Sequence, residues 1–125
     1  MKLEDFYTKE RHDEGAEVRL KDEAGKLTGC YLRVAGLDSE AYREAKAKLE
    51  RAALMASMVE TDDKPSTSLL RAECLADCVI DGRGFDGDVD KERMIKLFIM
   101  APYVADQVDS FISKRANFMR PSAKK

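Results

Sequence analysis

The chain has 125 residues, of which 44% are hydrophobic and 37% are charged, and its formal net charge is −2 at pH 7. This size and composition predict one soluble domain with one core, and no stretch approaches the roughly 20 apolar residues that a membrane-spanning helix needs. The slightly acidic balance argues against a nucleic-acid-binding surface, which normally needs a basic face, and only the C-terminal third is locally basic. We therefore expect neither nucleic acid nor a membrane among the partners.

The N-terminal segment allows two interpretations. Residues 1–12 carry Leu3, Phe6 and Tyr7 among charged side chains. They can form a short helix that docks Leu3 and Phe6 on the core, or they can be a loosely held terminus. Because they lack the apolar stretch of a secretory signal, we expect a cytoplasmic protein.

A β-hairpin is predicted next. Residues 16–22 alternate apolar and polar side chains, which is the period of a half-buried strand, and residues 28–34 form a second strand. Gly25 lies between them, where the turn favours a residue that tolerates a positive φ. Because a lone hairpin is marginal in water, we expect it to pack on helices of this chain or to pair with a strand of another chain.

Helices are expected after the hairpin. Asp38, and Asp90 or Asp88, can cap the first and third of them, because a carboxylate accepts hydrogen bonds from the free amides of a first turn. The second is apolar around most of its girth, so it should lie centrally or against a partner, with Gly82 as its C-cap. The four predicted helices cover residues 39–59, 67–81, 90–100 and 102–118.

The first helix and the last two should each bury one face. Met94–Met100 is the densest apolar run, and the Ala101-Pro102 step after it predicts a sharp corner, because proline suits the first turn of a new helix. Phe98 and Phe111 should then both be substantially buried, and most methionines should fill the core. The inner stripe of the first helix is expected to consist of Tyr42, Ala45, Leu49, Ala52, Ala53, Ala56 and Val59.

No pattern in the sequence makes a metal centre or an active site. Asp86, Asp88 and Asp90 are spaced like the start of a calcium loop, but Lys91 and Leu97 stand where that loop needs a glycine and a bidentate glutamate. The glycines at 82, 84 and 87 are spaced like a dinucleotide-binding turn, but they follow a predicted helix and lie among acidic residues. We therefore predict a non-enzymatic protein without a metal or a cofactor.

The cysteines and the single histidine are interpreted as structural. Cys74 and Cys78 are four residues apart in a helical pattern, which favours buried, reduced core thiols over metal ligands. His12 is expected to be exposed, because no serine, cysteine or carboxylate in its sequence context marks it as a catalytic base.

The C-terminal segment carries a family resemblance. Its motifs are APYVADQV at 101–108, FI at 111–112 and RANF at 115–118, and the N-terminal MKLEDF and the RVAGLDS junction at 33–39 add to them. Together they resemble the tail assembly chaperones of long-tailed bacteriophages. One departure is Arg83, because that family tends to have an apolar or aromatic residue after the second helix, which puts a partner contact at this position in doubt.

The resemblance implies a chaperone that binds the tape-measure protein, helps to recruit the major tail-tube protein in the host-cell cytoplasm, and is absent from the finished virion. The alternative is a structural head–tail joining or tail completion protein that stays in the virion. A small host-side regulatory adaptor is a third, more distant alternative.

The residues expected to contact a partner are Phe118, Met119, Tyr103 and Phe85. Phe118 and Met119 should form exposed apolar surface beside the C-terminal tail. The hairpin edges and the predicted helix 67–81 are hard to bury in a chain of this length, so we also expect weak self-association through them.

A flexible tail is expected at residues 121–125, beyond a domain that covers residues 1–120. Pro121 stops the last helix, and no large apolar side chain follows it. The resemblance also implies a longer form made by ribosomal frameshifting, and Lys124-Lys125 can be encoded by a slippery run of adenines. The nucleotide sequence of the gene would test this hypothesis.

Overall fold

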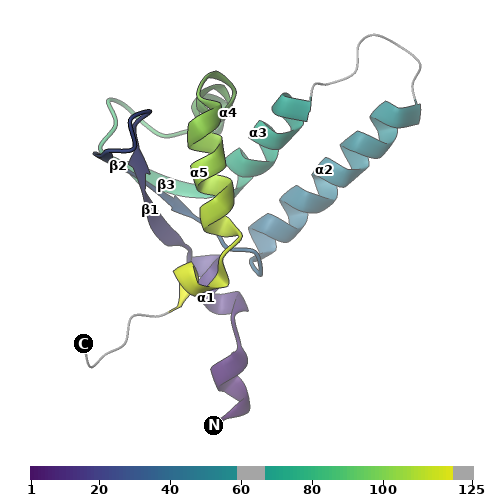
Figure 1. The fold of residues 1–125 in the computed structure, drawn as a ribbon. Coiled ribbons are helices and arrows are strands. Elements are labelled where there is room, and N and C mark those ends of the chain that lie inside the picture. The colour runs from purple at the N-terminus through teal and green to yellow at the C-terminus, as the bar shows by residue number, and fades with distance from the viewer. Residues whose placement is uncertain (59–66, 120–125) are drawn as a thin grey trace.

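A three-stranded antiparallel sheet and five α-helices form the computed structural model, which describes residues 1–58 and 67–119 (Figure 1). This arrangement, with its N-terminal hairpin, confirms the predicted α+β class. The expected tail at 121–125, with Lys124-Lys125, and Val59 lie outside the described residues. The elements are the turn η1 (Leu3–Phe6), α1 (Lys9–Glu14), β1 (Ala16–Lys21), β2 (Leu27–Val34), α2 (Glu40–Met58), α3 (Thr67–Cys78), β3 (Val79–Arg83), α4 (Lys91–Met100), α5 (Pro102–Ile112) and the turn η2 (Arg115–Phe118).

The hairpin forms as predicted. β1 and β2 pair antiparallel, and Gly25 in the turn between them has a φ of 84°. The Asp22 carboxylate closes this turn by accepting hydrogen bonds from the N–H groups of Ala24 and Lys26, each at 3.0 Å. The inward-facing residues of the two strands, Val18, Leu20, Leu32 and Val34, are all buried.

The predicted helix 67–81 is too long, because its last residues belong to a strand. α3 ends at Cys78, and β3 pairs antiparallel with β2, from Val79 opposite Val34 to Arg83 opposite Tyr31. β-Branched Val79 and Ile80 suit a strand, and pairing satisfies the free backbone groups of the β2 edge. The predicted C-cap at 82 is therefore wrong.

β3 covers one edge of the hairpin along its length, and the other edge has a partner at Lys21. β3 occupies the edge of β2, and a side chain of α5 occupies the end of the β1 edge. The Oε1 atom of Gln107 accepts from the Lys21 N–H at 2.8 Å, and its Nε2 atom donates to the Lys21 carbonyl at 2.9 Å. Self-association stays a prediction, and of the two edges expected to mediate it the β2 edge is covered by β3.

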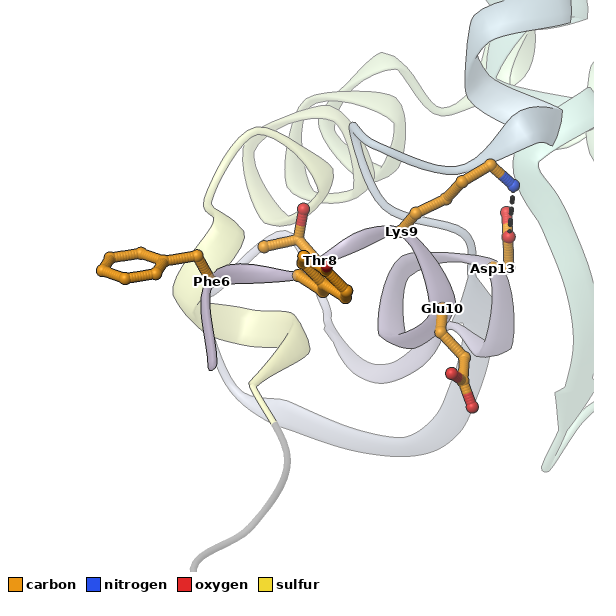
Figure 2. Close-up of a pocket in the computed structure, with 6 residues that line it drawn as sticks. Phe6, Thr8, Lys9, Glu10 and Asp13 are labelled. Atoms are coloured by element: carbon orange, nitrogen blue, oxygen red, sulfur yellow. Dashed lines mark hydrogen bonds and ion pairs between the residues drawn. The ribbon is translucent and has the colours of Figure 1, made fainter. Parts of the chain in front are cut away.

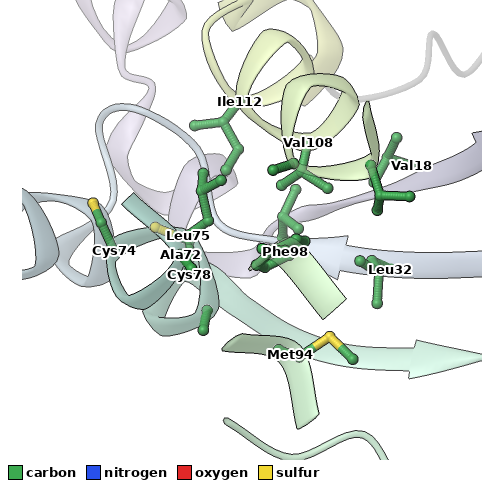
Figure 3. Close-up of a cluster of buried hydrophobic side chains, with 14 of the residues drawn as sticks. Val18, Leu32, Ala72, Cys74, Leu75, Cys78, Met94, Phe98, Val108 and Ile112 are labelled. Atoms are coloured by element: carbon green, nitrogen blue, oxygen red, sulfur yellow. The ribbon is translucent and has the colours of Figure 1, made fainter. Parts of the chain in front are cut away.

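The core centres on α3, which packs on both α2 and α4 (Figure 3). This position confirms the expectation for a helix that is apolar around most of its girth. Phe98 of α4 is buried as predicted, whereas Phe111 of α5 is half-buried. The residues of α3 that are buried in the cluster are Ala72, Cys74, Leu75, Ala76 and Cys78.

Two of the predicted helix starts are confirmed and one is corrected. Asp90 caps α4 by accepting from the Arg93 N–H at 2.8 Å, and Pro102 stands at the start of α5, so the corner forms as predicted. At α2, however, the cap is Ser39, whose hydroxyl accepts from the Tyr42 N–H at 3.0 Å. The last helix is also shorter than expected: α5 ends at Ile112, and η2 follows.

α2 buries less of its length than the sequence suggests. Of the expected inner stripe, Ala45 is buried and Ala53 is exposed, and the other described members are half-buried, namely Tyr42, Leu49, Ala52 and Ala56. Figure 1 shows the reason: α2 meets the rest of the fold near its N-terminal end, and its C-terminal half projects beyond the sheet. A large part of this helix is therefore available to other molecules.

Candidate interaction surfaces

The four predicted partner-contact residues do not form one surface. Met119 is 65% exposed and Tyr103 is 40% exposed, but Phe85 is half-buried against the core. Phe118 is only 3% exposed, so its prediction as exposed apolar surface is wrong. η2 folds back and places the Phe118 ring against His12, with 4.7 Å between ring centroids, and edge-on to Phe111 at 5.5 Å.

His12 itself is fully buried, which corrects the expectation of an exposed histidine. Its Nδ1 atom accepts a hydrogen bond from the Asp38 N–H at 2.9 Å, and its backbone carbonyl accepts from the Gly36 N–H at 3.0 Å. Gly36 leaves room for the ring, because a Cβ atom there would lie 2.3 Å from Nδ1. Instead of Leu3 and Phe6, which are 72% and 67% exposed, it is His12 that docks the N-terminal segment on the body.

Four charged side chains lie close enough to this histidine to affect its pKa. Burial is the main effect, and it lowers the pKa of His12. The Asp38 carboxylate and, more weakly, Asp13 raise this pKa, whereas Arg115 and Arg11 lower it further. Asp38 receives two hydrogen bonds from the Arg115 guanidinium, at 2.9 and 3.0 Å, and a third from the Thr8 hydroxyl. The Arg115 and Thr8 hydrogen bonds lower the pKa of Asp38 to about 2. These hydrogen bonds and ion pairs join α1, the β2–α2 loop and η2, and they stabilise the arrangement of the three segments.

The cysteines are core thiols, as predicted. Cys74 and Cys78 are buried, and burial raises the pKa of Cys78 to about 12, so this thiol is a poor nucleophile at neutral pH. Within residues 1–58 and 67–119, no three histidine, cysteine or acidic side chains gather in a way that could hold a metal ion.

Arg83 has a structural role on the outer face of the sheet. Its guanidinium lies over the Tyr31 ring, 3.8 Å from the centroid, and donates two hydrogen bonds to Glu17 at 3.0 and 3.1 Å. Arg19, on the other neighbouring strand, lies 5.6 Å from the same ring. These contacts link all three strands, so Arg83 has a role in holding the sheet together.

Three exposed apolar surfaces remain in the described part of the chain. The first, here called the corner surface, lies at the junction of α4 and α5 and consists of Ile99, Met100 and Tyr103, which are 38%, 73% and 40% exposed. The second, the α2 tip, consists of Leu54, Met55 and Met58, which are 59%, 65% and 73% exposed. The sequence interpretation missed the α2 tip, because it assigned most methionines to the core.

The third surface is the N-terminal arm, residues 1–7, with Leu3, Phe6 and Tyr7 between 59% and 72% exposed. Figure 2 shows Phe6 directed away from the other labelled side chains, while Lys9 and Asp13 form an ion pair at 2.8 Å. An open depression lies beside this arm. It is lined by Phe6, Tyr7, Thr8, Lys9, Glu10 and Asp13.

Comparison with protein-family models, with curated proteins and with solved structures gives no match for this chain. No helix in the described residues is both long and apolar enough to cross a membrane.

Proposed function

We propose that this protein is a non-enzymatic tail assembly chaperone of a long-tailed bacteriophage or prophage. It binds the tape-measure protein and helps to recruit tail-tube subunits in the host-cell cytoplasm, and it is not retained in the mature virion. The observation that carries this proposal is the corner surface. It places exposed Tyr103 inside the motif at 101–108 that resembles that family, with exposed Ile99 and Met100 directly before that motif.

The chemistry of the corner surface suits a long and variable client. Met100 is the most exposed of its members, and an unbranched thioether side chain adapts to many apolar partners without a fixed geometry. Ile99 and Tyr103 add a stiff aliphatic and an amphipathic aromatic side chain beside it. Such a surface favours reversible covering of apolar segments over tight recognition of one shape.

The polar groups favour binding over catalysis as well. His12, Cys74 and Cys78 are buried in the interior, and the half-buried thiol of Cys30 donates a hydrogen bond to the Gly84 carbonyl at 3.3 Å. The remaining strong contacts, such as Arg83 with Glu17 and Arg115 with Asp38, are ion pairs that hold elements together. This distribution supports a protein that acts through its surface.

Co-expression with the tape-measure protein tests the proposal. The wild-type chain should keep that protein in the soluble fraction, and Met100→Ser with Tyr103→Ser should reduce the soluble yield severalfold. Ile80→Ser is the matched control, because Ile80 is 49% exposed on β3 and lies beside Gly15, outside α4 and α5. Equal yields with and without the wild-type chain would contradict the chaperone role.

Mass spectrometry of purified virions tests the other half of the proposal. A chaperone should be present in lysates of infected cells and absent from virions. Recovery from virions at a fixed stoichiometric copy number would instead support the head–tail joining or tail completion protein.

A further inference from the structure

A depression lined by two arginines lies where α1, the start of β1, β2 and η2 meet. Its volume is about 330 Å³, which is at the lower end of the range of ligand-binding pockets. The side chains that give it its chemistry are Arg11, Glu14, Arg33, Asn117, Phe118 and Met119. No other part of the described structure that we have discussed uses this arginine-lined depression.

Both arginines are held by the fold, and neither has a carboxylate partner. The Nε atom of Arg33 donates to the Glu14 carbonyl at 2.8 Å, whereas the Nε atom of Arg11 is buried without a hydrogen-bond partner. Within residues 1–58 and 67–119, neither guanidinium forms an ion pair, in contrast to those of Arg83 and Arg115. Because a charged donor is stabilised by an acceptor, an acidic group from another molecule would complete this site.

The acidic side chains near the depression limit the charge that it can accept. Glu17 stands opposite Arg33 in the sheet, but its carboxylate already accepts two hydrogen bonds from Arg83. Glu14 is the one acidic residue of the lining, so two positive charges face one negative charge. A separate depression, which Arg11 also borders, is lined by Glu4, Asp5 and Glu10. These carboxylates would repel a polyanion such as a nucleic acid, so the charges favour a single carboxylate.

We infer that this depression binds the carboxylate of an acidic residue in an extended segment of a partner protein. A guanidinium can donate two parallel hydrogen bonds to a carboxylate. The Nδ2 atom of Asn117 donates to the Phe111 carbonyl at 2.9 Å, which leaves its Oδ1 atom to accept a peptide N–H. Met119 is 65% exposed and offers an apolar contact to a side chain beside the acidic residue. Donors, an amide acceptor and an apolar side chain together suit a peptide better than an inorganic anion.

The inference does not rest on the proposed function. Tyr103 of the corner surface lies in the first turn of α5, whereas η2 and Met119 follow the other end of this helix. A partner bound in the depression would therefore leave the corner surface uncovered.

An NMR titration of isotope-labelled full-length protein tests the inference. The probe is a blocked tripeptide with a glutamate between two leucines, and the matched peptide has a glutamine in its place. The glutamate peptide should shift the side-chain N–H signals of Arg11 and Arg33 and the backbone signals of residues 117–119, whereas the glutamine peptide should not. Arg11→Gln and Arg33→Gln should each weaken binding about tenfold, because each removes a charged hydrogen-bond donor.

The controls make the result specific. Arg51→Gln changes an exposed arginine of α2, outside the depression, and should bind the glutamate peptide like wild type. The comparison of the two peptides uses the wild-type chain, so it does not depend on how well a variant folds. Equal shifts with both peptides would overturn the inference, as would unchanged affinity in both variants, or inorganic phosphate that binds as tightly as the glutamate peptide. None of these results involves the tape-measure protein, so they leave the proposed function to its own test.

Discussion

His12 lies where α1, the β2–α2 loop and η2 meet, and one of its two ring nitrogens, Nδ1, has a hydrogen-bond partner. Since Nδ1 accepts the Asp38 N–H, the neutral ring carries its proton on Nε2, and this atom has no hydrogen-bond partner in the described structure. A proton added at Nδ1 would break the bond from Asp38 and place a positive charge in the interior. The geometry therefore favours the neutral form, in agreement with the lowered pKa.

The lowered pKa of His12 predicts that the free energy of unfolding falls in mild acid. The His12 pKa in the folded chain is below the ordinary value of 6.5, so the unfolded chain binds a proton first. The contribution of neutral His12 is complete above about pH 6.5 and declines as the pH falls below that value. Urea unfolding at pH 7.5, 6.5 and 5.5 should show a falling free energy of unfolding, and His12→Gln should flatten the slope.

The pH range between 7.5 and 5.5 separates the effect of His12 on stability from that of the carboxylates. His12 is the only histidine, and the depressed pKa of Asp38 means that its own contribution is lost only as the pH falls from about 4 towards about 2. A free energy of unfolding that is constant between pH 7.5 and 5.5 would show that His12 is not held in its neutral form by folding.

Gly36 is the residue that makes room for the ring. Gly36→Ala should destabilise the fold by about 1–3 kcal/mol, the usual cost of overpacking, because the new methyl group would meet a ring that is fixed on all sides. Chemical denaturation measures this loss. Gly29→Ala is the control, because a Cβ atom at Gly29 would have nothing within 4 Å; an equal loss in both variants would refute the packing argument.

At the scale of elements, the cap of α4 allows a discriminating prediction. The sequence left Asp90 and Asp88 open as caps, and the structure assigns the side-chain bond to Asp90, whereas Asp88 accepts from Arg93 through its backbone carbonyl. Asp90→Ala should cost about 0.5–2 kcal/mol, as the loss of an N-cap does. Asp88→Ala should cost clearly less in the same thermal unfolding measurement, and the reverse order would contradict the assigned cap.

The elements differ in how far the sequence predicts them. The hairpin and the corner at Ala101-Pro102 follow from local signals, namely alternation, a turn glycine and a proline. β3 does not, because Val79–Arg83 continues an apolar helical pattern and becomes a strand only through pairing with β2, which is distant in the sequence. For the same reason, local capping rules selected Asp38, whose carboxylate is instead committed to Thr8 and Arg115.

The candidate surfaces were predicted only in part, for a related reason. Exposure of Met119 and Tyr103 agrees with their positions near helix ends, but burial of Phe118 depends on His12, at the opposite end of the chain. The α2 tip was not predicted, because the sequence interpretation assumed that an amphipathic helix has one apolar stripe. Near its C-terminal end, α2 carries apolar side chains on two faces, and only the packing of the whole chain decides which face stays outside.

At the scale of the whole molecule, two aromatic rings of α4 and α5 differ in how deeply they are buried in the core. Phe98 is 3% exposed at the centre of the cluster, whereas Phe111 is half-buried and packs at its edge against Phe118. Phe98→Ala should therefore cost about 3–5 kcal/mol, the range of a fully buried aromatic residue, because it removes contacts with the central helix and leaves a cavity. Phe111→Ala should cost less, since part of its ring already meets water.

Equilibrium unfolding in urea gives both values on one scale, and the two variants should share the wild-type dependence on urea concentration if the chain unfolds as one unit. Phe111→Ala also removes the edge contact to Phe118, so it should loosen η2 and the ring that covers His12. The slope of stability between pH 7.5 and 5.5 should then become shallower in this variant, because water reaches the imidazole more easily. A slope as steep as in wild type would show that the His12 cluster and the α5 edge of the core are independent.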